Sequence, residues 1–142
     1  MSLRRLRLLH AVMMTAHRST VAVVEDDDSV RKALCRLLRA AGFSSRGYAS
    51  GQEFLESWLV DPPECVVLDL QMPGLSGMEV QRRLSRAGAP PATIFITAHD
   101  QPGTREECLR AGAVAYLQLR RTVQRWGAEK PTVLRGASDP VS

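Results

Sequence analysis

The chain has 142 residues and a mass of 15.6 kDa, which is the size of one ordinary domain, so we expect no fused catalytic or DNA-binding domain. Its 44% hydrophobic and 24% charged residues are typical of a globular protein, no apolar run is long enough to span a membrane, and three cysteines without paired spacing predict reduced thiols in a cytoplasmic protein. The net charge of +4 comes from the two ends of the chain, because residues 21–119 carry 13 acidic and 10 basic side chains, and we expect no direct nucleic-acid binding by this middle part.

The first 19 residues form a basic segment ahead of the first predicted strand. Apolar residues recur there at helical spacing between arginines: Leu6, Leu9, Met13 and Ala16. A secretion signal is one interpretation, but the apolar stretch is short, His10 interrupts it, and no good small-residue cleavage site follows. We therefore interpret residues 1–19 as an N-terminal extension that can form a helix.

From residue 20 to residue 119, short apolar runs alternate with longer amphipathic stretches, which is typical of parallel strands joined by crossover helices. The first strand, 21–24, runs into four acidic residues at 25–28. A helical stripe follows and stops at Gly42; it consists of Val30, Leu34, Leu37 and Leu38. Residues 43–49 are more polar and predict a second strand near the edge of the sheet.

The middle of the chain contains two further predicted helices and the central strand. Residues 50–53 have the spacing of a capping box and open a short helix with inward-facing Phe54, Leu55, Trp58 and Leu59. The third strand, 65–68, is apolar throughout, as expected of a central strand covered on both faces, and it ends at Asp69. Proline and glycine predict a loop over 71–77, and a helix follows over about 78–87.

The remaining elements are two strands and the helix between them. A fourth strand is predicted over 93–96 and a fifth over 114–119. Residues 104–107 repeat the capping-box spacing before a helix that Gly112 closes. No sustained apolar face follows the fifth strand, and we expect residues 122–142 to form a divergent or disordered tail.

Two of the predicted strands end in carboxylates: the first in Glu25 and Asp26, and the third in Asp69. In an open parallel sheet the ligand site lies beyond the carboxyl ends of the strands, so these acids converge if the two strands are neighbours. Clustered carboxylates repel one another, and a hard divalent cation such as Mg²⁺, which prefers oxygen ligands, makes such a cluster tolerable. The alternative is that the acidic run only caps the following helix; capping explains Asp28, but not an acid at the end of the third strand.

Four motifs in order carry a family resemblance: VVEDDDSVR at 23–31, VVLDLQMPGLSG at 66–77, ITA at 96–98 and AGAVAY at 111–116. Over roughly residues 20–119 the chain resembles the receiver domain of two-component response regulators, in particular receivers attached to LuxR-type helix-turn-helix outputs. The resemblance implies an α/β, flavodoxin-like, doubly wound sheet of five parallel strands in the order 2-1-3-4-5. It implies a receiver domain at 20–121, a last helix that is degenerate or missing here, and a phosphorelay switch rather than an enzyme.

The resemblance also implies the chemistry of the site. Asp69 would accept a phosphoryl group from the phosphohistidine of a sensor histidine kinase or phosphotransfer protein. Asp26 would bind Mg²⁺ directly, Glu25 would bind it through water, and the backbone carbonyl of Gln71 would supply a further ligand. A second copy of the chain is a further candidate partner, and no membrane partner is expected.

The switch residues implied by the resemblance lie on the last two strands. Thr97 and Ala98 would contact the phosphoryl group, and Tyr116 would change rotamer; alternatively Thr97 is an ordinary β-branched strand residue and Tyr116 an ordinary half-buried aromatic. The family places a Lys followed by Pro at the end of the fifth strand, where this chain has Leu119 and Arg120. The missing cation should impair signalling more than Mg²⁺ binding, since the acids remain.

Two alternative functions follow from the same residues. The first is a pseudo-receiver, an interaction module that no longer switches because Leu119 replaces the lysine. The second is a Mg²⁺-dependent phosphatase of haloacid-dehalogenase type, which also uses an aspartate nucleophile after a strand. That family has a second aspartate two residues after the nucleophile, where this chain has Gln71, so this alternative ranks last.

Overall fold

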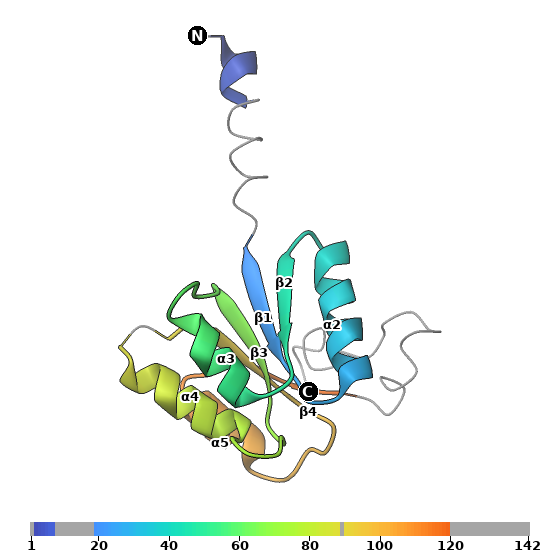
Figure 1. The fold of residues 1–142 in the computed structure, drawn as a ribbon, viewed down its shortest axis with the longest axis vertical. Coiled ribbons are helices and arrows are strands. Elements are labelled where there is room, and N and C mark those ends of the chain that lie inside the picture. Colours follow the sequence, from blue (N-terminus) through green and yellow to red (C-terminus); the bar gives the residue numbers. More distant parts are fainter. Residues whose placement is uncertain (1, 8–18, 89, 120–142) are drawn as a thin grey trace.

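The computed structural model describes residues 2–7, 19–88 and 90–119 of the chain (Figure 1). Strands and helices alternate from residue 20 to residue 118 in the order β1 (Thr20–Val24), α2 (Asp28–Ala40), β2 (Ser44–Tyr48), α3 (Gly51–Trp58), β3 (Cys65–Asp69), α4 (Gly77–Arg86), β4 (Ala92–Thr97), α5 (Thr104–Arg110) and β5 (Ala115–Gln118). The five strands pair in parallel in the order β2-β1-β3-β4-β5. This confirms the α/β class and the flavodoxin-like strand order; the predicted tail and last helix lie outside the described residues.

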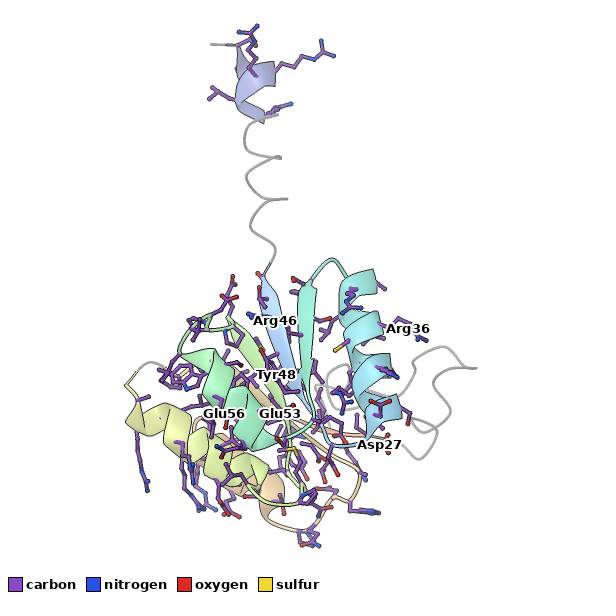
Figure 2. The ribbon with its side chains drawn as sticks, in the orientation of Figure 1. Asp27, Arg36, Arg46, Tyr48, Glu53 and Glu56 are labelled. Carbon is purple, nitrogen blue, oxygen red and sulfur yellow. The ribbon has the colours of Figure 1, made fainter. Side chains whose placement is uncertain are left out.

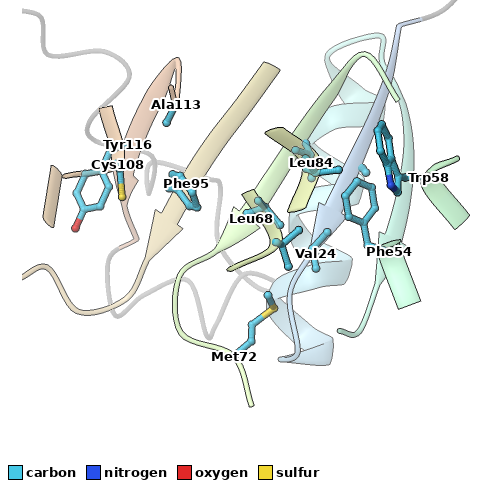
Figure 3. Packing of buried hydrophobic residues seen from close by; sticks show 13 residues of the cluster. Val24, Phe54, Trp58, Leu68, Met72, Leu84, Phe95, Cys108, Ala113 and Tyr116 are labelled. Atoms are coloured by element: carbon cyan, nitrogen blue, oxygen red, sulfur yellow. The ribbon is translucent and has the colours of Figure 1, made fainter. Parts of the chain in front are cut away.

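Each face of the sheet carries its own apolar layer, because side chains alternate between the two faces along a strand. The helix α2 covers one face, where the buried residues include Val21, Val23, Val30, Leu34, Val67, Ile96, Leu117 and Leu119. The helices α3, α4 and α5 cover the other face, with buried Val24, Phe54, Trp58, Leu68, Leu84, Phe95, Cys108 and Tyr116 (Figure 3). Since β1 and β3 lie inside the sheet, they are apolar on both faces, and the sheet is doubly wound.

The second strand lies at the edge of the sheet, as its polar sequence predicts. The capping box of α3 is also confirmed. The Ser50 hydroxyl accepts a hydrogen bond from the Glu53 backbone N–H at 3.1 Å, and the Glu53 carboxylate accepts one from the Ala49 N–H at 3.2 Å. These bonds satisfy N–H groups that have no partner within the helix.

Three local predictions about element ends are wrong. Thr104 does not cap α5: Gly103 precedes that helix in a left-handed conformation, with φ of +85° and no side-chain cap. The reason is a turn in which the Thr104 N–H donates to the Gln101 carbonyl at 3.2 Å, which makes Thr104 the first helical residue. Leu59 is 75% exposed because α3 ends at Trp58, and Val114 is exposed because β5 begins one residue later.

Outside the sheet, residues 3–7 form a helical turn on which Leu3 and Leu6 are exposed. No helix in the described ranges combines the length and apolar character that crossing a membrane requires. All three cysteines are free thiols, and two of them, Cys35 and Cys108, are buried. They fill space in the two apolar layers, as small apolar residues do.

Candidate functional site

Three carboxylates meet at the carboxyl ends of β1 and β3. These strands are neighbours in parallel register, with Val24 opposite Leu68, so the residues that follow, Glu25 and Asp69, come side by side. One carboxylate oxygen each from Glu25, Asp26 and Asp69 lies within 4.8 Å of the others. The predicted convergence of these acids is confirmed, while their individual roles stay predictions.

Two of the three carboxylates are buried, which makes their charges costly. Glu25 is 5% exposed and Asp69 is 9% exposed, whereas Asp26 is open to solvent. Burial, together with a hydrogen bond to Asp69 and the charge of Asp69, raises the pKa of Glu25 to about 9. Burial also raises the pKa of Asp69, although its hydrogen bond with Glu25 opposes that shift. The two buried groups therefore resist being ionised together when no cation is present.

Backbone groups orient both buried carboxylates. The Asp27 N–H donates to Glu25 Oε1 and the Gln71 N–H donates to Asp69 Oδ1, each at 3.1 Å. The second bond places the backbone of Gln71 beside Asp69, next to the acids with which it is predicted to share a cation. A loop from 70 to 76 then leads into α4.

Gly77, the first residue of α4, packs directly on the backbone of Asp69. A Cβ atom at this position would lie 2.5 Å from the Asp69 carbonyl oxygen, which is closer than any real contact of that kind. The Gly77 N–H also donates to the Leu70 carbonyl at 3.2 Å. The sequence identifies Gly77 only as a loop residue; its contact with the strand end depends on how α4 folds back.

The donor chemistry of this cluster fits a magnesium ion. Mg²⁺ takes oxygen ligands, is commonly held by one or two carboxylates, and keeps several waters. Glu25, Asp26 and Asp69 supply three carboxylates, and exposed Asp26 leaves one side open to water. A cation here would also relieve the repulsion between the two buried acids.

The predicted switch residues on β4 engage the following loop. The buried Thr97 hydroxyl donates to the His99 carbonyl at 3.0 Å and accepts from the His99 N–H at 3.1 Å, while Ala98 is exposed. Asp69 lies opposite Ile96 in the β3–β4 register, so Thr97 follows one residue beyond that pair. The Thr97 hydroxyl therefore lies near the strand ends, but both of its hydrogen bonds are made with the His99 backbone in the turn that follows.

Tyr116 is buried on β5 and reaches the same loop. Its hydroxyl donates to Asp100 Oδ1 at 2.5 Å. Burial, followed by the hydrogen bond to Asp100 and that residue's charge, raises the pKa of the Tyr116 phenol. Tyr116 and Thr97 thus hold the loop after β4 from two sides.

Leu119 is 6% exposed and packs in the apolar layer under α2. Its backbone N–H donates to the Thr97 carbonyl at 2.7 Å, so the end of β5 stays attached to β4. The position that the family gives to a lysine therefore holds a buried apolar side chain. Arg120, at the family's proline position, lies outside the described residues.

Two contacts of this site are absent from the predictions made from the sequence. The Arg31 guanidinium donates to the Glu25 carbonyl at 2.8 Å and pairs with Asp28, which ties α2 to the end of β1. Asp100 lies 16 residues from Tyr116 and was not predicted as its partner. Helical spacing from the acidic run points at Arg31, but no spacing rule links Asp100 to Tyr116.

Comparison with known proteins identifies what this arrangement belongs to. A family model described as the response regulator receiver domain matches residues 21–122. Nodulation protein W of Bradyrhizobium diazoefficiens is 38% identical over 100 residues, which are 70% of this chain and 44% of that protein. The transcriptional regulatory protein FixJ of Azorhizobium caulinodans is 35% identical over 98 residues, which are 69% of this chain and 46% of that protein. The chain thus spans less than half the length of these curated relatives.

Solved structures agree with the sequence comparison. A response regulator receiver protein from Burkholderia phymatum is 53% identical, with a TM-score of 0.63, over 71% of this chain and 82% of the other. A structure described as FixJ-N is 32% identical, with a TM-score of 0.66, over 72% of this chain and 82% of the other.

Proposed function

The chain belongs to the response regulator receiver domain family, whose members are signalling switches of two-component systems, and from this premise we propose that Asp69 is its phosphoacceptor. The observation that supports the proposal most is the position of the buried Asp69 carboxylate, within 4.8 Å of two further carboxylates that can share a divalent cation. We propose that the receiver domain spans residues 20–121, between an extension at 1–19 and a tail at 122–142.

The proposed reaction is a transfer between a histidine and an aspartate. A carboxylate oxygen of Asp69 attacks the phosphorus of a phosphohistidine on a sensor histidine kinase or phosphotransfer protein, an O–P bond forms, and the N–P bond breaks. The imidazole leaves with the electron pair of that bond and takes a proton. The Gln71 N–H donates to Asp69 Oδ1 and so helps to orient the carboxylate for this attack.

Mg²⁺ would be held by Asp26 directly, by Glu25 through water, by Asp69 and by the Gln71 carbonyl. When bound, it would offset negative charge on the transferring phosphoryl group. Glu25 is buried and accepts the Asp27 N–H, which keeps its carboxyl group directed at the cluster rather than at solvent. With the cation present, both buried carboxylates can be ionised, as the transfer requires of Asp69.

Switching would act through the loop after β4. To donate to a phosphoryl oxygen, the Thr97 hydroxyl has to give up the hydrogen bond that it donates to the His99 carbonyl, and the backbone of Ala98 would move with this change. The same movement changes the position of Asp100, the partner of Tyr116. A rotamer change of Tyr116 would then carry the modification to the surface around α5 and β5.

A second candidate function is the pseudo-receiver, and Leu119 is the observation that favours it. Its side chain is buried among apolar residues and offers no charge to a phosphoryl group. In that case the chain keeps the acidic site but couples phosphorylation weakly, or not at all, to the loop after β4. A homodimer, a cytoplasmic location and the lack of direct nucleic-acid binding stay predictions in both cases.

The test is incubation of the protein with MgCl₂ and acetyl phosphate, followed by intact-mass spectrometry. We expect an adduct of one phosphoryl group that Asp69→Asn abolishes and that Asp61→Asn, an exposed aspartate away from the site, leaves unchanged. The ring resonances of Tyr116 and the amide chemical shifts of residues 97–103 report the switch. An adduct with no change in these signals indicates the pseudo-receiver, and a wild-type protein that binds Mg²⁺ but forms no adduct refutes phosphoacceptor function.

A further inference from the structure

A second candidate site lies between α2 and the edge strand β2. It is a hollow of about 260 Å³ lined by Arg31, Lys32, Cys35, Arg36, Arg39 and Gly47. None of these residues belongs to the carboxylate cluster, and the lining is cationic where that cluster is acidic. The hollow therefore needs an explanation of its own.

Gly47 lets the Arg31 stem pack directly on the β2 backbone at the edge of the hollow. Ser45 faces α2, where its hydroxyl donates to the Cys35 carbonyl at 3.1 Å, and residue 47 faces the same side because side chains alternate along a strand. A Cβ atom at Gly47 would lie 3.1 Å from Arg31 Cγ and Cδ and 3.5 Å from Cys35 Sγ. Without a side chain, the floor of the hollow is β2 backbone and the stem of Arg31.

Its charge is only partly balanced. Asp28 pairs with Arg31 and with Lys32, the latter at 2.9 Å. Within the described part of the chain, Arg36 and Arg39 make no ion pair. Four cations and one carboxylate leave three positive charges around one small space. Figure 2 shows Arg36 projecting outward from α2.

The spacing of these cations favours a compact ligand of high charge. Lys32, Arg36 and Arg39 follow one another at helical spacing and span about 10.5 Å along α2. An extended acidic peptide presents one carboxylate to a given side about every 6.6 Å, so it would bring about two charges into that length. A chain of two or three phosphates carries more charge in less space, and guanidinium groups bind phosphate oxygens in pairs.

We propose that the hollow between α2 and β2 binds the di- or triphosphate group of a small ligand. The chemistry is shared by free inorganic polyphosphates and by nucleotides, and the Arg36 and Arg39 guanidinium groups are its main contacts. Arg31 borders the site but stays committed to the Glu25 carbonyl and Asp28. The proposal does not depend on phosphorylation of Asp69.

The test is calorimetric titration of the full chain with inorganic triphosphate and, separately, with a nucleoside triphosphate. Metal-free buffer at about 0.15 M salt, without phosphate or citrate, removes Mg²⁺ chelation from the measurement. We expect saturable binding of one triphosphate per chain. Equal affinity for the two ligands identifies the phosphate chain as the whole determinant, and tighter binding of the nucleotide identifies nucleotides as the source.

Matched variants locate the site. The double variant Arg36→Ala/Arg39→Ala should weaken binding by about a hundredfold, since each of the two lost charged contacts is worth roughly tenfold. Gly47→Val keeps every cation but places a side chain against the Arg31 stem and the Cys35 thiol that line the hollow, and it should weaken binding similarly. Arg82→Ala/Arg86→Ala removes two exposed arginines from α4 as a control, and it should leave the affinity unchanged, as should Asp69→Asn.

Four results would overturn the proposal. The first is the lack of saturable binding by a wild-type protein whose circular dichroism is native. The second is an equal loss in the α4 control variant, which indicates attraction to net charge alone. The third is unchanged affinity in Gly47→Val, because the hollow would then not be the determinant. The fourth is binding of duplex DNA or an acidic peptide with higher affinity than either triphosphate, because the ligand would then not be a compact phosphate chain.

Discussion

At the scale of single residues, the neighbouring Glu25 and Asp69 are two buried acidic groups whose joint ionisation is energetically unfavourable. Both carboxyl groups are buried, and no cation among the described side chains pairs with either of them. Burial is the largest cause of the raised pKa of each. The pair therefore destabilises the folded state unless a metal ion or a proton neutralises one of the charges. The free energy of unfolding should accordingly depend on pH.

We predict that the metal-free protein loses stability as the pH rises. The pKa of Glu25 is raised from 4.5 to about 9 on folding, so between these values the folded state binds more protons than the unfolded state. Linkage then makes the free energy of unfolding fall with rising pH across this window. Urea titrations with chelator at pH 5, 7 and 8.5 measure it. Glu25→Gln should flatten the dependence, and a wild-type slope as flat as that of the variant would contradict the prediction.

Leu119→Lys should change phosphorylation and stability in opposite directions. The lysine stem can follow the path of the buried leucine while its ammonium group reaches toward the strand ends. We expect faster modification by acetyl phosphate and larger chemical-shift changes in residues 97–103. The free energy of unfolding should fall by about 2 kcal/mol because apolar packing is lost. Leu119→Met, which keeps the apolar packing, is the control and should change neither rate nor shifts.

At the scale of elements, helix starts position the site. Gly77 lets α4 begin against the carbonyl of Asp69, so Gly77→Ala pushes a methyl group into strand backbone that cannot yield like a flexible side chain. We expect a loss of about 1–3 kcal/mol in the free energy of unfolding and weaker Mg²⁺ binding. Chemical denaturation and Mg²⁺ titration measure the two effects. Unchanged Mg²⁺ affinity would show that α4 does not position Asp69.

The cap of α3 offers a simpler test. Ser50→Ala removes the acceptor of the Glu53 N–H and should cost about 1 kcal/mol of stability. It should leave Mg²⁺ binding unchanged, because α3 contributes no carboxylate to the cluster. Ser85→Ala, at an exposed serine within α4, is the matched control and should cost close to nothing. Equal losses in both variants would contradict the capping role.

At the scale of the whole molecule, two apolar layers stabilise the sheet, and the acidic site lies at one edge of it, where the strands end. The layers under α2 and under α3, α4 and α5 hold β1 and β3 side by side, and this neighbourhood brings the acids together. Ligand binding at the edge should therefore stabilise the whole fold.

Mg²⁺ should raise the melting temperature of the wild-type protein. A ligand at about 100 times its dissociation constant adds about 2.7 kcal/mol to the free energy of unfolding by mass action. Asp69→Asn should abolish most of this increase and, in metal-free buffer, should melt at or above the wild-type temperature because it removes a buried charge conflict. Differential scanning calorimetry with and without MgCl₂ measures both; an Asp69→Asn protein that still gains full stability from Mg²⁺ would exclude Asp69 as a ligand.

The residue pattern by itself determined the strands and helices, their order along the chain, and which of their residues are buried. Apolar runs of four or five residues, alternating with helical stripes, identify β1, β3 and β4 and the helices between them, because local periodicity follows from backbone geometry. The acids at the ends of β1 and β3 follow from the same pattern. Errors occurred where elements end, for example at Leu59, Gly77, Thr104 and Val114, because ends depend on turns that single side chains do not specify.

Only the tertiary structure decided which distant groups touch. The spacing of Glu25 and Asp69 depends on β1 and β3 being neighbours in register, and the bond from Tyr116 to Asp100 depends on how a loop returns over β5. The Gly47 hollow likewise needs α2 to lie across an edge strand from which one side chain is missing. Such contacts join residues far apart in the chain, and the free energy of packing, which selects them, is a property of the assembled layers rather than of any local segment.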